Sequence, residues 1–256
     1  MQKVRVWDLS VRLFHWLLAA LILTNLVIGG EEGTLFAVHV YVGYAALLLV
    51  VFRLLWGLVG SRFARFGSFV VGPRRAAAYG LELAQGEVER HPGHTPLGGY
   101  MILALLATVL AMAVTGILAG QGNHGAEDLH ELLSNVLIVL VALHLAGVAL
   151  HSWRARENIV RAMVTGEKSL PPPAAAEVPP LVSGRRSVIV ASAVLLAGGL
   201  AAQQLDLMTL AAGEGGEGGE SGESGEGGEG GESGEGGESG EGGESGEGGE
   251  GGERGD

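Results

Sequence analysis

Five long apolar runs dominate the first 205 residues of this 256-residue chain, and each holds at most one charged residue. A helix needs about 20 residues to cross the roughly 30 Å apolar core of a bilayer, and the first run reaches that length when counted as 11–30. The runs do not alternate polar and apolar residues, so they predict helices rather than barrel strands. Too little chain remains to bury five such helices in a soluble core. The sequence therefore predicts an all-α integral membrane protein whose spans cover Phe14–Ile28, Leu35–Val59, Leu97–Ala119, Leu129–Trp153 and Ser187–Leu205.

Basic residues fall on alternate sides of these predicted helices. Three precede the first helix, five lie between the second and third, and six lie between the fourth and fifth, whereas the other two loops hold none. Cytoplasmic loops carry the excess of Lys and Arg in membrane proteins. We therefore expect a multi-pass membrane protein with a cytoplasmic N-terminus and a C-terminal tail on the opposite side of the membrane.

The tail, residues 213–256, is a Gly/Ser/Glu repeat with a glutamate at every third position from Glu214 to Glu253. It holds 15 of the 28 acidic residues and one of the 16 basic residues, so the formal charge of −12 belongs to the tail and not to the body. Such a segment repels itself and cannot bury a core, which predicts disorder. Three interpretations stay open: a solvated extension, a segment that attracts a basic partner, or a weak calcium binder.

Composition also narrows the function. The body has no basic face, which argues against a nucleic-acid partner, and the absence of cysteine excludes iron–sulfur clusters and covalent haem attachment. We expect four parts: a four-helix domain over 1–168, a Pro/Ala-rich linker over 169–186, a fifth transmembrane helix over 187–212, and the tail.

Five of the eight histidines lie within or at the ends of the apolar runs, where an ionisable side chain indicates a functional site. His130 and His144 are 14 residues apart, which places them on one helix face about 21 Å apart. His39 begins the second helix at the depth of His130. His15 lies about 21 Å below the outer end of the first helix, level with His144. The spacing predicts two pairs: His39 with His130 outside, and His15 with His144 inside.

Two imidazoles facing each other across a helical bundle are typical axial ligands of haem b. Zinc would usually take three or four protein ligands, and a proton relay would recruit buried acids, of which only Glu131 lies near this level. We therefore expect two non-covalent, bis-histidine haems b that form an electron path across the bilayer. His151, seven residues after His144 and nearer the cytoplasm, is the rival ligand for the inner haem; otherwise it is an interfacial residue beside Trp153 and Arg154.

Two arginines are candidates for binding a propionate of the inner haem. Arg53 is the one basic residue inside an apolar run, and it either pairs with the propionate or extends to the cytoplasmic interface. Arg12, close to His15, is the second candidate. The remaining histidines, His91, His94 and His124, lie in predicted loops and are expected at the surface.

With these positions in place, residues 3–168 resemble the bacterial cytochrome b561 and nickel–iron hydrogenase b-type cytochrome superfamily. Any one of the shared strings is weak, but together they are specific. They are Trp7-Asp8-Leu9, Arg12-Leu13-Phe14-His15-Trp16, His39 with Gly43-Tyr44, Phe52-Arg53-Leu54-Leu55-Trp56-Gly57, Gly60-Ser61-Arg62, Gly72-Pro73-Arg74, Pro96-Leu97-Gly98, His130-Glu131-Leu132-Leu133 with Asn135, Ala142-Leu143-His144, and Arg156-Glu157-Asn158 with Met163-Val164-Thr165-Gly166.

The resemblance implies a four-helix dihaem cytochrome of the bacterial inner (plasma) membrane, with its tail on the periplasmic side, whose axial ligands are His15, His39, His130 and His144. It also implies electron transfer between the membrane quinone pool and a protein partner, which is a hydrogenase, another dehydrogenase or a c-type cytochrome. Strings around 52–62 and 156–166 are most similar to the subgroup that works beside soluble c-type cytochromes. The fifth helix and the tail lie outside the resemblance.

Several alternatives stay open at this point. Contact with quinone would make the protein a quinone or quinol oxidoreductase, and without it the protein is an electron relay. It could also be a haem-binding anchor subunit of a larger oxidoreductase, or a haem-free transporter or scaffold. Besides membrane lipid and these redox partners, a second copy in a homodimer is among the partners considered.

Overall fold

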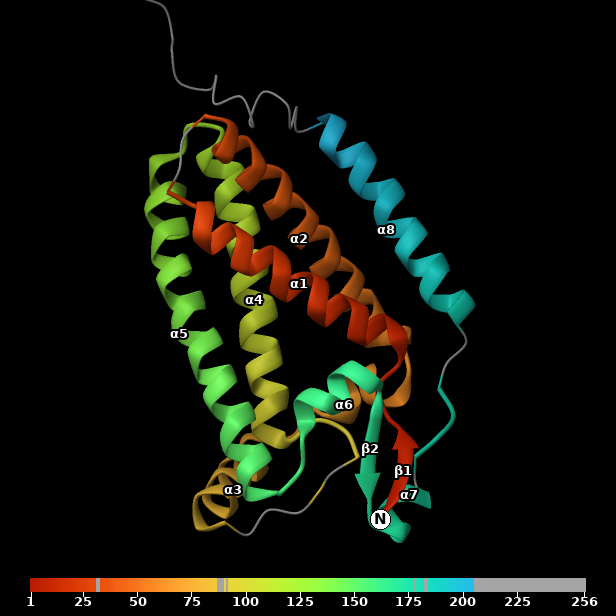
Figure 1. Ribbon diagram of the computed structural model, residues 1–256. Coiled ribbons are helices and arrows are strands. Elements are labelled where there is room, and N and C mark those ends of the chain that lie inside the picture. Colours follow the sequence, from red (N-terminus) through yellow and green to blue (C-terminus); the bar gives the residue numbers. More distant parts are fainter. Residues whose placement is uncertain (31–32, 87–89, 91, 177, 182–183, 205–256) are drawn as a thin grey trace, which may run out of the picture. The chain divides into compact units, whose positions relative to one another are not determined.

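The computed structural model describes residues 1–204 apart from 31–32, 87–89, 91, 177 and 182–183 (Figure 1). The predicted acidic tail, and residues 205–212 of the predicted fifth helix, lie outside the described residues. Within the described residues, all five predicted spans are confirmed as helices long and apolar enough to cross a membrane. They are α1 (Leu9–Ile28), α2 (Thr34–Val59), α4 (Pro96–Ala119), α5 (His124–Arg154) and α8 (Gly184–Gln204).

Capping residues explain why two of these helices begin before their apolar runs. The Asp8 carboxylate accepts a hydrogen bond from the Val11 amide at 2.8 Å, so α1 begins at Leu9. The Asn123 side chain accepts one from the Ala126 amide at 3.0 Å, so α5 begins at His124. Each cap satisfies a backbone N–H that the first turn of a helix leaves unpaired.

Helices α1, α2, α4 and α5 form the bundle that the sequence predicts. α4 packs against α5, α1 against α2, and α2 against α4. Apolar side chains from all four helices meet in one core, made of Phe14, Val50, Leu106, Val109 and Leu137. The bundle therefore holds the histidines of α1, α2 and α5 in a fixed relation to one another.

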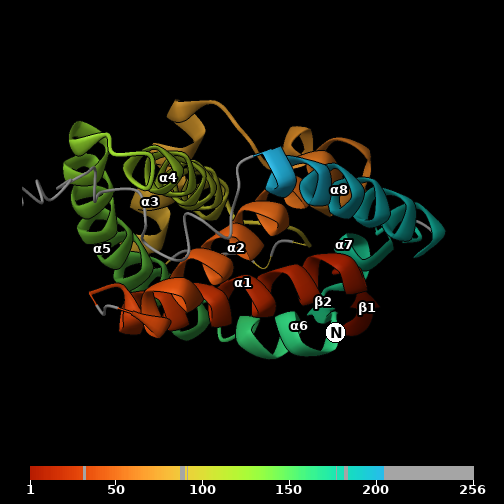
Figure 2. The ribbon, with the colours of Figure 1, turned by 90° about the horizontal axis from the view of Figure 1, so that it is seen from above.

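The fifth helix packs against α2, on the side of the bundle away from α5 (Figures 1 and 2). Gly198 leaves room for the Leu48 side chain of α2, which a Cβ at this position would overlap. The Tyr44 hydroxyl donates a hydrogen bond to the Gly198 carbonyl. Close approach through a small residue, with one polar contact, is the usual way in which membrane helices associate.

Short elements gather at the end of the bundle where α1 begins and α5 ends (Figure 1). They include a two-stranded antiparallel ribbon, which an all-α prediction does not contain. Its pairing joins the start of the chain to the segment that follows α6, with Val4 opposite Lys168. The short elements are β1 (Gln2–Arg5), η1 (Arg62–Ala64), η2 (Phe66–Ser68), α3 (Pro73–Gln85), α6 (Ile159–Thr165), β2 (Glu167–Leu170) and α7 (Pro172–Ala176), the last within the predicted linker.

Gly166 ends α6 in a left-handed conformation, with φ of 84°, and its carbonyl accepts hydrogen bonds from the Val6 and Trp7 amides at 2.9 and 3.1 Å. A Cβ at this position would lie 2.9 Å from the Trp7 carbonyl oxygen. Glycine is therefore required twice, for the backbone angle and for the close contact.

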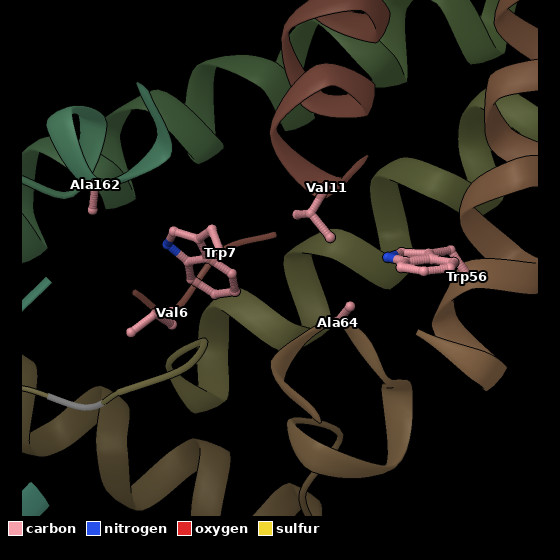
Figure 3. Packing of buried hydrophobic residues seen from close by; sticks show 6 residues of the cluster. All are labelled: Val6, Trp7, Val11, Trp56, Ala64 and Ala162. Atoms are coloured by element: carbon pink, nitrogen blue, oxygen red, sulfur yellow. The ribbon is translucent and has the colours of Figure 1, made fainter. Parts of the chain in front are cut away.

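A second apolar cluster fills this end of the molecule, and Figure 3 shows its six buried members. Trp56 is 1% exposed, and its indole Nε1–H donates to the Asp8 carboxylate at 3.1 Å. Asp8 therefore caps α1 with one oxygen and holds α2 with the other. The cluster consists of Val6, Trp7, Val11, Trp56, Ala64 and Ala162.

We predict that Asp8→Ala lowers the free energy of unfolding by about 2–4 kcal/mol. Loss of an N-cap costs about 1 kcal/mol, and a buried indole N–H without a partner costs about 1–3 kcal/mol more. Thermal unfolding in detergent would measure the loss. Ser10→Ala, two residues further along the same turn, is the control; an equal loss in both variants would contradict the dual role of Asp8.

Candidate functional site

His39 on α2 and His130 on α5 lie together, with ring centroids 6.1 Å apart and ring planes at 74°. The Nδ1 of His130 is 2.9 Å from the Met112 carbonyl oxygen on α4 and 3.2 Å from the Thr115 hydroxyl. An Nδ1–H that donates to this carbonyl fixes the tautomer and leaves Nε2 as the metal-binding nitrogen. The third predicted helix has no histidine, yet it orients the outer pair through Met112 and Thr115.

Gly116 gives this ring its space. A Cβ at Gly116 would lie 3.2 Å from Cε1 and 3.3 Å from Nδ1 of His130, which is tighter than ordinary van der Waals contact. A glycine at this point of α4 therefore allows the imidazole to lie flat enough against the helix to reach the Met112 carbonyl. Sequence reasoning missed Met112, Thr115 and Gly116, because no helical period links them to the histidine on α5.

His15 on α1 and His144 on α5 form the second close pair, with ring centroids 6.4 Å apart and planes at 51°. His15 also makes an edge contact with Trp16 at 5.0 Å. The Nδ1 atoms of His15 and His39 are buried without a hydrogen-bond partner. These two nitrogens are thus withdrawn from solvent, although the rings that carry them are only partly buried.

The separation within each pair fits one iron between two imidazoles. The ring centroids lie 6.1 Å apart in one pair and 6.4 Å apart in the other. With a metal–nitrogen bond of about 2.0 Å, one metal ion between the rings of a pair could bind a nitrogen of each. Among the described residues, no group of three or more His, Cys, Asp and Glu side chains could hold a metal ion. Each pair would therefore hold a metal only with a cofactor that supplies further ligands, as haem b does.

Both candidate propionate ligands contact backbone at the end of the bundle where α1 begins. Arg53 is 2% exposed, donates to the Ala64 carbonyl at 3.0 Å, and lies 5.1 Å from the centre of the Phe66 ring. Arg12 donates to the Val164 carbonyl. The Arg53 side chain therefore does not extend to solvent, and a role for either arginine toward a propionate stays a prediction.

His151 belongs to a buried polar cluster that the sequence did not reveal. Its Nδ1 is 2.8 Å from the Tyr79 hydroxyl, and its Nε2 is 3.9 Å from the Glu157 carboxylate, which lies 3.5 Å from Lys168 Nζ. Burial opposes ionisation of Glu157, but His151 and Lys168 hold the pKa of this carboxyl below its usual value. Burial lowers the pKa of Lys168 and raises the pKa of Tyr79. His151 is thus a buried residue and not one exposed at the interface.

The loop histidines differ from expectation at one position. His124 is exposed as predicted, and His91 lies outside the described residues. His94 was predicted at the surface, whereas it is partly buried: its ring packs against Trp7 and Phe69, with centroids 4.5 Å from each. Burial, with Arg53 and Lys168 nearby, lowers the pKa of His94 to about 3. The aromatic neighbours come from distant segments, so local sequence could not show this burial.

Comparison with known proteins supports these observations. The family described as prokaryotic cytochrome b561 matches residues 6–166. A probable Ni/Fe-hydrogenase B-type cytochrome subunit of Rhizobium leguminosarum bv. viciae is 24% identical over 215 residues, covering 65% of this chain and 89% of that protein. No solved structure gives a significant match.

An apolar helical bundle that carries paired histidines and matches these proteins defines a b-type membrane cytochrome. The chain belongs to the prokaryotic cytochrome b561 family. Family membership supports a haem b electron-transfer role in the membrane and argues against the haem-free transporter or scaffold.

We predict that Glu157→Gln lowers the free energy of unfolding at pH 7 by about 3–5 kcal/mol, because it removes the buried carboxylate that lies 3.5 Å from the ammonium group of Lys168. Since the pKa of Glu157 is lowered in the folded state, its contribution is present above the unfolded value of about 4.3 and is lost as pH falls below it. Thermal unfolding in detergent at pH 7 and pH 3.5 should therefore show a smaller acid effect in Glu157→Gln. Glu167→Gln, at an exposed neighbour on β2, is the control; an equal loss there would contradict the assignment.

Proposed function

We propose that the chain is a dihaem b-type cytochrome that transfers electrons across the bacterial inner membrane between the quinone pool and a protein redox partner. The observation that carries this proposal is the close approach of two histidine pairs from different helices, with ring centroids 6.1 and 6.4 Å apart. His39 with His130 would hold the outer haem, and His15 with His144 the inner haem. Haem b supplies reversible one-electron chemistry when it is bound.

The protein's own residues position these groups. Met112 accepts a hydrogen bond from Nδ1 of His130, which fixes the ring and raises its basicity. Phe14, Val50 and Leu137 belong to the buried apolar core that packs the helices of the bundle together. The two levels are about 21 Å apart along α5, from the 14-residue spacing of its histidines. This distance would take electrons most of the way across the apolar layer.

The proposed orientation of the protein in the membrane rests on the distribution of charge. The excess of Lys and Arg near the start of α1 and the end of α5 supports a cytoplasmic location for that end. The outer pair and the C-terminal end of α8 would then lie on the periplasmic side. A quinone contact is proposed from the family resemblance, and a homodimer stays a prediction.

Two classes of protein partner are supported by different observations. The relative named as a probable hydrogenase cytochrome subunit favours a hydrogenase, for which this chain would be the haem-binding membrane subunit. The strings at 52–62 and 156–166, together with the acidic tail, favour a soluble c-type cytochrome instead. Co-purification with a hydrogenase would support the first partner over the second.

We predict that His144→Ala removes one of two haems and that His151→Gln removes neither. His144 faces His15, whereas His151 contacts Tyr79 and Glu157. Haem per chain, measured as the pyridine haemochrome against protein mass, should fall from two to one in the first variant and stay at two in the second. The reverse result would assign the inner haem to His151.

We predict that removal of 213–256 leaves haem content unchanged but slows electron transfer to a basic soluble cytochrome c about tenfold at low salt, with little effect at high salt. Charge steering of this kind is strong at low ionic strength and is screened at about 0.5 M salt. Stopped-flow absorbance measures the rate. A variant whose tail keeps its length but has glutamine in place of each glutamate separates the effect of charge from that of length. Equal rates at low salt for the full-length, truncated and glutamine-tail proteins would favour a simple solvated extension.

A further inference from the structure

A groove lies between the last turns of α5 and the helix α6, and its lining on α5 begins one residue after His144. Its volume is about 820 Å³. One wall is apolar and is formed by Leu145, Val148 and Ala149, which follow His144 along α5. The other end is polar and includes Arg156 and Arg161. The groove therefore joins a surface suited to hydrocarbon to a surface suited to an anion.

The positive charge of the groove is not neutralised within the described part of the chain. Arg156 and Arg161 are exposed, and no carboxylate among the described residues lies within ion-pair distance of either guanidinium. Glu157 also lines the groove, but its carboxylate faces the buried Lys168 at 3.5 Å. Two unpaired guanidiniums in one groove favour an anion with several oxygens, such as a phosphate diester.

The backbone holds Arg156 in place. Its φ of 49° makes it the one non-glycine residue with positive φ among those described. Such a conformation costs free energy and persists only where neighbours enforce it. Arg90 does so, because its guanidinium donates to the Ala155 carbonyl at 3.2 Å and to the Arg156 carbonyl. These hydrogen bonds fix the backbone of the turn between α5 and α6, and the Arg156 side chain lines the groove.

The groove also lies at the level of a membrane interface. Trp153, at the end of α5, is 71% exposed, and the Arg154 guanidinium lies 4.8 Å from the centre of its ring. Exposed tryptophan beside arginine marks the headgroup region of membrane helices. On the apolar side, Leu145 and Val164 are 60% and 52% exposed, as expected for side chains that contact acyl chains.

We propose that this groove binds an anionic phospholipid of the cytoplasmic leaflet, with its phosphate between Arg156 and Arg161 and an acyl chain along Leu145, Val148 and Ala149. The leaflet rests on the proposed orientation of the chain, whereas the binding chemistry does not. Basic pockets on the cytoplasmic side of membrane proteins recognise anionic headgroups in this way. The lipid would fix the end of α5 that carries His144.

Native mass spectrometry of the full-length protein in detergent tests the proposal with phosphatidylglycerol and phosphatidylcholine as probes. We expect phosphatidylglycerol to bind at least tenfold more tightly than phosphatidylcholine. Arg156→Gln combined with Arg161→Gln should weaken phosphatidylglycerol binding about tenfold. Arg74→Gln combined with Arg75→Gln removes the same charge from exposed residues of α3 and should change it less than twofold. Ala149→Phe should weaken binding without a change of charge.

Several results would overturn the proposal. Equal losses in the two arginine pairs would indicate a general charge effect, and equal binding of both lipids would remove the role of the headgroup. Displacement by inorganic phosphate at the same concentration, or no effect of Ala149→Phe, would indicate a free-phosphate site. Displacement by a short-chain quinone would assign the groove to quinone. The same spectra report bound haem by mass, so failure of the haem assignment would be seen separately from failure of lipid binding.

Discussion

The arrangement depends on polar imidazoles held close together inside an apolar layer. An ionisable side chain at this depth is costly unless it has a partner. His15 with His144, and His39 with His130, each leave a separation that one iron would span. Without iron, the four imidazoles would lie in the apolar layer with few partners. Haem binding and the stability of the bundle are therefore expected to be linked, as binding to the folded state alone stabilises that state.

The rest of the fold supports this geometry from one end. The ribbon of β1 and β2, the cap at Asp8 and the apolar cluster around Trp56 tie the start of α1 to α2 and α6. Because α1 carries one histidine of the inner pair and α5 carries the other, these contacts limit how far the two rings can move apart. At the other end, a carbonyl of α4 orients His130. The paired histidines are thus positioned largely by residues that are not themselves candidate metal ligands.

What the sequence could predict follows from the range of each interaction. Hydropathy and the helical period are local, so the five spans, and the 14-residue spacing that puts His130 and His144 on one face of α5, are visible in the chain itself. The exact helix ends are set by the caps at Asp8 and Asn123. They were harder to predict, because Asp and Asn also occur in many other structural roles. The shared sequence strings predicted membership of the cytochrome b561 family, which the family match over residues 6–166 confirmed.

Other features could not be predicted, because they arise between segments far apart in the chain. The packing of His94 against Trp7 and Phe69, and the buried Tyr79–His151–Glu157–Lys168 cluster, need contacts across most of the cytochrome domain. The ribbon pairs residues near the N-terminus with residues after α6, where neither strand has a strong local signal. For the same reason, the groove beside α6 becomes visible only when Arg156 and Leu145 are seen on one surface.

The central claim, two haems each held by two histidines, is tested most directly by counting haem per chain in the purified full-length protein and recording its near-infrared magnetic circular dichroism in the oxidised state. The account predicts two haems b per chain, both with the charge-transfer band of bis-imidazole iron. A single haem per chain, or a signal from iron with only one imidazole ligand, would contradict it.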